Sequence, residues 1–156
     1  MDDFKVGQLT KELVAIQLKR KEDPCAVAAD IVHRTLRVAI RAIPPGDAGR
    51  GLVIEEAIYG GMQAMVLGDH DLSRGSVFLL EGVADLASEF GLDPTEALRS
   101  ALCGLARLRR LLTVEQLDDL RFAIGERFLG AAEVYAELLE AQPDPGARSL
   151  NLAKMP

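Results

Sequence analysis

Apolar residues recur at intervals of three and four positions along almost the whole chain, which is the spacing of helices that bury one face. No segment alternates apolar and polar positions over a useful length, so no strand is predicted. In the first part of the chain the pattern predicts helices at about residues 5–21, 24–43, 50–67 and 72–90. The apolar stripe of the first helix, which we expect to face the core, consists of Val6, Leu9, Leu13 and Ile16.

Local signals mark where several of these helices begin and end. The Asp-Pro pairs at 23–24 and 93–94 each combine a side chain that accepts hydrogen bonds from the first backbone amides with a residue suited to the first helical position. Gly91 suits the left-handed cap that ends a helix. Thr113 and Gln116 have the spacing of a capping box. These signals predict a fifth helix from residue 94 and a sixth from residue 114.

The sixth predicted helix is long, reaching about residue 141, and it carries two adjacent apolar stripes. Two stripes are more than one partner helix needs, so we expect one to lie in the core and the other to form a homodimer contact. The first stripe comprises Leu117, Leu120, Ile124, Phe128, Ala131 and Tyr135. The second comprises Phe122, Leu129, Ala132 and Leu139.

Helices joined by short connections predict an all-α fold, a six-helix antiparallel bundle. Residues 1–142 are expected to form a single helical domain and residues 143–156 an extended tail. Sliding the chain by about 70 residues places the two Asp-Pro pairs on each other, which suggests two three-helix repeats at about 3–68 and 72–141. The alternative is that any helical protein aligns its leucines when slid against itself.

Glycines lie inside several predicted helices. Each costs up to about 1 kcal/mol relative to alanine, so we expect them where helices approach closely, in the core or at a subunit contact. They are Gly60, Gly61, Gly82, Gly104, Gly125 and Gly130.

Composition narrows the function. The net charge of −6 argues against a nucleic-acid partner, because phosphate contacts need a basic surface. No apolar run is long enough for a membrane span, and the N-terminal segment lacks the pattern of a secretory signal. Cys25 and Cys103 lack zinc-site spacing and are expected to be reduced thiols. A cytoplasmic protein without a cofactor follows as the expectation.

A cluster of potential metal ligands lies in the connection before residue 72. Asp69, His70 and Asp71 offer two carboxylates and one imidazole, which are ligands for a divalent metal. The alternative is a polar turn in which Asp71 or Ser73 caps the next helix.

The same segment resembles the TerB-like tellurite-resistance family, in which an acidic turn joins two helices and the second ends near Gly-Leu-Asp. The matching residues are Asp69, Leu72, Ser73 and the run 91–93. Where the family has an acidic residue just after the Ser, this chain has Gly75 and Ser76. The resemblance implies a helical protein that senses a small ligand or a divalent metal.

Two surface features favour interaction with a protein. Arg34, Arg37 and Arg41 form a stripe that can grip carboxylates, and the sixth helix supplies such groups within the chain or between subunits. In the tail, the apolar residues are spaced to dock in a groove. They are Leu150, Leu152 and Met155.

These observations favour a non-enzymatic helical protein–protein interaction or regulatory module that forms a homodimer. The nucleophile motif G-x-S-x-G and a complete phosphate-binding loop are both lacking in the sequence, so no catalytic residue is assigned. Two alternatives stay open: a small-ligand or divalent-metal sensor of TerB-like type, and an enzyme of unassigned class.

Overall fold

The computed structural model describes residues 5–17 and 23–142, and these residues are helical without a strand. The prediction of an all-α fold is confirmed. The helices are α1 (Val6–Gln17), α2 (Pro24–Arg41), α3 (Gly49–Leu67), α4 (Leu72–Phe90), α5 (Pro94–Ala106), α6 (Val114–Arg127) and α7 (Ala131–Ala141), with a short 3-10 helix η1 (Arg107–Leu111) after α5.

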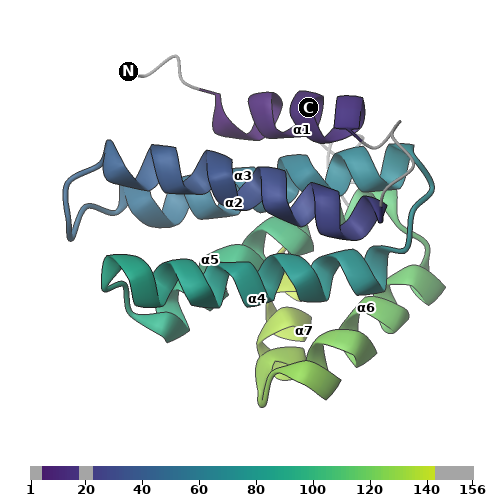
Figure 1. The fold of residues 1–156 in the computed structure, drawn as a ribbon. Coiled ribbons are helices and arrows are strands. Elements are labelled where there is room, and N and C mark those ends of the chain that lie inside the picture. Colours follow the sequence, from purple (N-terminus) through teal and green to yellow (C-terminus); the bar gives the residue numbers. More distant parts are fainter. Residues whose placement is uncertain (1–4, 18–22, 143–156) are drawn as a thin grey trace, which may run out of the picture.

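The helices are stacked in successive layers (Figure 1). α1 packs on α2 and α3, which in turn pack on α4 and α5. At the other end of the stack, α6 packs on α4 and α7 packs on α5, and the two also contact each other. The first helix and the last two therefore cover opposite ends of the described part of the chain.

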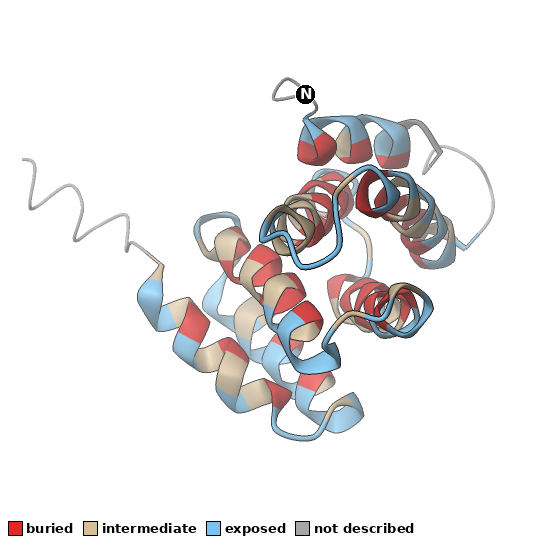
Figure 2. Cartoon of the chain, turned by 90° about the vertical axis from the view of Figure 1, so that its left-hand side faces the viewer, coloured by how far each residue is buried: buried red, intermediate tan, exposed pale blue. Residues whose placement is uncertain are grey.

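Buried positions lie on the inner side of every helix and form one hydrophobic cluster through the layers (Figure 2). The cluster is built mainly from medium-sized aliphatic side chains, as the composition suggests. Its largest fully buried members include Leu36, Ile58, Met62, Leu79, Leu102 and Tyr135.

The local start and stop signals act as predicted. Asp23 and Asp93 accept hydrogen bonds from the first backbone amides of α2 and α5. Gly91 ends α4 in the left-handed conformation, with φ of 66°. Thr113 and Gln116 form the predicted capping box at the start of α6. These signals work because each depends only on residues within one turn of it.

The prediction of one long sixth helix is wrong in one respect, because the structure has two helices there, α6 and α7. The chain leaves helical geometry at Phe128 and turns at Gly130, whose φ of 79° is left-handed. α7 can then turn back onto α5 and α6, so the described residues contain seven α-helices and the six-helix count is wrong. The first stripe still faces the core on both sides of the turn, with Leu120, Ile124 and Tyr135 buried.

This turn also affects the suggested duplication. Shifting α3 by 70 residues places it on residues 119–137, which include the break between α6 and α7. The third helices of the two suggested repeats therefore do not correspond. The repeat stays a prediction for the first two helices of each unit, in which α1 would correspond to α4 and α2 to α5.

The orientation of α1 differs from the predicted one. Val6 is buried as predicted, but Leu9 and Leu13 are 39% and 38% exposed, and Thr10 and Val14 face the core in their place. The cause is a close approach between helices, in which Gly7 of α1 must face Gly60 of α3. The side chain of Ile16 lies outside the described part of the structure.

None of the helices in the described ranges combines the length and the apolar character that crossing a bilayer requires. The predicted tail, with Leu150, Leu152 and Met155, lies outside the described residues.

Candidate functional site

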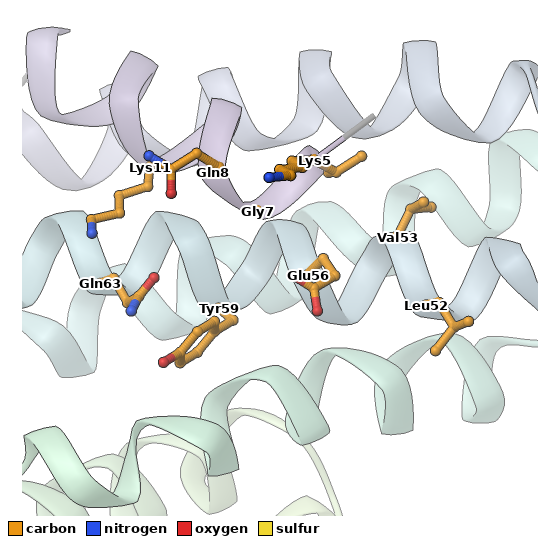
Figure 3. A pocket seen from close by; sticks show the side chains of 10 residues that line it. Lys5, Gly7, Gln8, Lys11, Leu52, Val53, Glu56, Tyr59 and Gln63 are labelled. Carbon is orange, nitrogen blue, oxygen red and sulfur yellow. The ribbon is translucent and has the colours of Figure 1, made fainter. Parts of the chain in front are cut away.

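A groove of about 590 Å³ runs between α1 and α3 (Figure 3). We call it the α1–α3 groove. Its floor is formed where Gly7 meets α3, and its walls are side chains that project from the two helices on either side of that contact. It is lined by Lys5, Val6, Gly7, Gln8 and Lys11 and, from α3, by Leu52, Val53, Glu56, Tyr59 and Gln63.

Arg107, at the start of η1, holds one wall of this groove in place. Its Nη1 donates to Glu56 Oε1 at 2.7 Å and to Glu55 Oε2 at 3.2 Å. Its guanidinium also lies 4.1 Å from the centre of the Tyr59 ring, which is a favourable cation–π distance. Burial lowers the pKa of Arg107, but the hydrogen bond and the charge of Glu56 outweigh it, and the pKa is raised. The positive charge of Arg107 therefore balances the negative charge of Glu56, and its guanidinium packs against one face of the Tyr59 ring.

A second candidate surface lies on the outer side of α6. Val114 and Phe122 are 74% and 70% exposed, and Leu129 in the following turn is fully exposed. A shallow hollow of about 370 Å³ lies beside Phe122. It is lined by Asp118, Arg121, Phe122, Gly125, Glu126 and Ala132. This surface, together with Val114 and Leu129, is called the α6 face below.

A further hollow of about 580 Å³ lies between the starts of α3 and α5. The backbone amides there already donate hydrogen bonds to carboxylates of the chain itself. Asp47 Oδ1 accepts from Gly49 N at 2.7 Å, and Asp93 Oδ1 accepts from Thr95 N at 2.9 Å. These helix starts are thus already satisfied by negative groups.

The predicted metal ligands lie in the turn between α3 and α4. Asp71 caps α4, with its Oδ1 accepting from Arg74 N at 3.1 Å, so the capping alternative is confirmed for this residue. Asp69 adopts a left-handed conformation, with φ of 54°, and His70 lies against Gly68. The described residues contain no group of three or more His, Cys, Asp or Glu placed to hold a metal, so the turn does not gather its three candidates.

Two residues of the predicted arginine stripe, Arg37 and Arg41, contact α4, and the third, Arg34, pairs within its own helix. Arg34 pairs with Asp30 one turn earlier on α2. Arg37 Nε donates to Glu89 Oε2 at 2.9 Å, and Arg41 lies 5.8 Å from the centre of the Phe90 ring. Within the described chain the stripe does not pair with the carboxylates of the predicted sixth helix, because α2 packs on α4 and those helices lie in the next layer.

Two glycines inside helices allow close packing in the core, as predicted. A Cβ at Gly104 would lie 2.6 Å from the Glu55 carbonyl oxygen, where α5 crosses α3. A Cβ at Gly82 would overlap the imidazole of His33, where α4 meets α2. The Nε2 of His33 lies 3.5 Å from the Leu79 carbonyl oxygen, and burial lowers the pKa of His33.

Tyr135 is the largest fully buried side chain, and burial raises its pKa well above the ordinary value. Its hydroxyl has no hydrogen-bond partner among the described residues. It belongs to the core beneath α7, away from both candidate surfaces.

The α1–α3 groove was missed by the sequence analysis. Glu56, Tyr59 and Gln63 follow one another at intervals of three and four along one flank of α3, which is a signal for a polar flank. The contribution of Arg107, more than fifty positions later in the chain, has no local signal.

No protein-family model, curated protein or solved structure matches this chain.

Proposed function

We propose that this protein is a non-enzymatic helical interaction module that associates with a second copy of itself through the α6 face. The observation that carries the proposal is the exposure of three large apolar side chains, Val114, Phe122 and Leu129, on α6 and the turn that follows it. Single exposed apolar residues are common on soluble proteins, but several of them on one short helix and its following turn favour a contact surface.

The charges around Phe122 favour a second copy as the partner. Arg121 is basic, and Asp118 and Glu126 are acidic, and all three line the hollow that contains Phe122. A contact with two-fold symmetry brings the same surface from both copies together, so the surface must complement itself. An antiparallel arrangement of two α6 helices whose two-fold axis passes between Asp118 and Arg121 would place each Arg121 near Asp118 of the other copy.

The shape of the surface is compatible with this arrangement. Gly125 is exposed and lines the hollow, and a Cβ there would lie 3.0 Å from the Cβ of Ala132, so its small size allows α7 to pack on α6. Phe122 beside it supplies a large apolar side chain, of the kind that is enriched at protein contacts. A pair of such helices would bury exposed apolar side chains of both copies.

Sedimentation equilibrium of the full chain over a concentration series tests the proposal. We expect a dimer for the unmodified protein and a monomer for Phe122→Glu, since the variant places a charge inside the apolar part of the contact. Leu67→Glu is the matched control, because Leu67 is 74% exposed at the far end of α3. A monomeric unmodified protein, or a dimer that Phe122→Glu leaves intact, would overturn the proposal.

A further inference from the structure

The lysines of the described residues, Lys5 and Lys11, both line the α1–α3 groove. Every ion pair between described residues uses an arginine instead. The groove's own carboxylate, Glu56, is held by Arg107 at 2.7 Å. In a chain with a net charge of −6, the groove therefore presents a local positive charge to a ligand.

Neutral hydrogen-bonding groups accompany the lysines. Gln8 projects from α1, where its amide nitrogen donates to Glu12 Oε1 at 2.8 Å and keeps a second N–H, and Gln63 and Tyr59 project from α3 (Figure 3). Ammonium, amide and phenol groups all donate hydrogen bonds, and bonds from charged donors to an anion are the strongest of these. Arg107 lies against the Tyr59 ring, so the aromatic wall is supported from behind. This set of donors suits a carboxylate, phosphate or sulfonate group.

The other end of the groove is apolar. Leu52 and Val53 lie there, away from Lys11, Gln63 and Tyr59 (Figure 3). The volume of about 590 Å³ is within the range of small-molecule sites. We infer that the α1–α3 groove binds a small organic anion: the anionic group contacts Lys11 on the side of Gln63 and Tyr59, Lys5 adds positive charge nearer the apolar end, and an apolar body covers Leu52 and Val53. The inference is independent of the α6 face.

Fluorescence titration with two probes tests this inference on the full chain. Anilinonaphthalene sulfonate combines an anionic group with an aromatic body, and phenylnaphthylamine has a similar body without the charge. We expect the Lys5→Gln/Lys11→Gln variant to bind the sulfonate about tenfold more weakly, with little change for the uncharged probe. Arg34→Gln/Arg41→Gln is the matched control, since it removes the same charge from α2 and should leave both affinities unchanged.

Amide chemical shifts locate the bound probe directly. We expect the sulfonate to move the signals of Gly7, Gln8, Tyr59 and Gln63, and to do so equally in the Phe122→Glu variant. Thermal melting of each variant shows whether it is folded. Absence of sulfonate binding, equal losses in the lysine and arginine variants, or shifts confined to the α6 face would each overturn the inference.

Discussion

Gly60 of α3 lies directly on the backbone of Gly7 in α1, so that a Cβ on Gly60 would overlap the Gly7 carbonyl oxygen. The contact is between two backbones, and neither can be moved by rotating a side chain. It holds α1 against α3, and Gly7 also lines the α1–α3 groove. The stability of the first layer and the shape of the groove therefore depend on the same pair of residues.

We expect Gly60→Ala to destabilise the protein by about 1–3 kcal/mol, because the added methyl group forces α1 away from α3. Urea unfolding monitored by circular dichroism measures the change. Gly51→Ala on the same helix is the control: its Cβ would lie 3.0 Å from the Ser100 hydroxyl oxygen, which belongs to a side chain that can rotate. A Gly60→Ala protein as stable as this control would show that the two helices separate without cost.

Arg107 joins α3 to the end of α5 through two carboxylates and one aromatic ring. We expect Arg107→Gln to cost about 1–3 kcal/mol, because it leaves partly buried acceptors without a charged donor. It should also weaken binding of the anionic probe, since Glu56 then becomes an uncompensated negative charge in the groove.

Arg107→Lys separates the effect of charge from that of shape. It keeps the positive charge but loses the planar group that stacks on Tyr59 and reaches two carboxylates. We expect it to recover probe binding more fully than stability. Equal recovery of both properties would indicate that the stacking on Tyr59 contributes nothing.

Acidification should destabilise the protein through His33. Burial is the largest cause of its lowered pKa, and it outweighs the opposite effects of the Leu79 carbonyl, Asp30 and Asp85; Arg37 also lowers the pKa. The unfolded chain, with an ordinary pKa of 6.5, therefore takes up a proton at a higher pH than the folded chain does. The stabilisation is present above that value and is lost as the pH falls through it towards the lower folded pKa.

Thermal melting as a function of pH measures this loss. We expect the melting temperature to fall between about pH 7 and pH 5. His33→Gln should flatten that part of the curve, whereas His70→Gln, in the α3–α4 turn, should leave it in place. A curve that keeps its slope in His33→Gln would assign the effect to other groups.

The sequence predicted those features that are determined within one helical turn. The starts of α2, α5 and α6 and the end of α4 follow from Asp23, Asp93, Thr113 and Gly91, whose hydrogen bonds or backbone conformation are local. A break at Gly130 was not predicted, because a glycine in a periodic pattern is compatible both with a continuous helix and with a turn.

Features that depend on contacts between distant helices were predicted poorly. On α1 the apolar pattern favoured Leu9 and Leu13 as core residues, but the contact between Gly7 and Gly60 turns a different face inward. The groove depends on the same contact and on Arg107, which comes from another layer. Periodicity shows that a face is apolar or polar, but it does not show which helix will lie against it.

The self-association proposed for the α6 face makes a specific prediction about charge. Arg121→Glu should weaken the dimer, because each copy would then present three acidic groups around Phe122: the new glutamate, Asp118 and Glu126. Like charges facing each other across a contact are unfavourable, and the effect should diminish at high salt. Sedimentation equilibrium at low and high ionic strength measures both effects.

The double variant Arg121→Glu/Asp118→Arg exchanges the positions of the two charges. In a two-fold contact the exchanged charges still face each other across the axis, so we expect the dimer to recover most of its affinity. Against a different protein the exchange would leave both charges mismatched, and binding would stay weak. A dimer affinity that recovers in the double variant but not in Asp118→Arg alone would therefore identify a second copy as the partner. Failure of the affinity to recover would exclude the antiparallel pairing of Arg121 with Asp118.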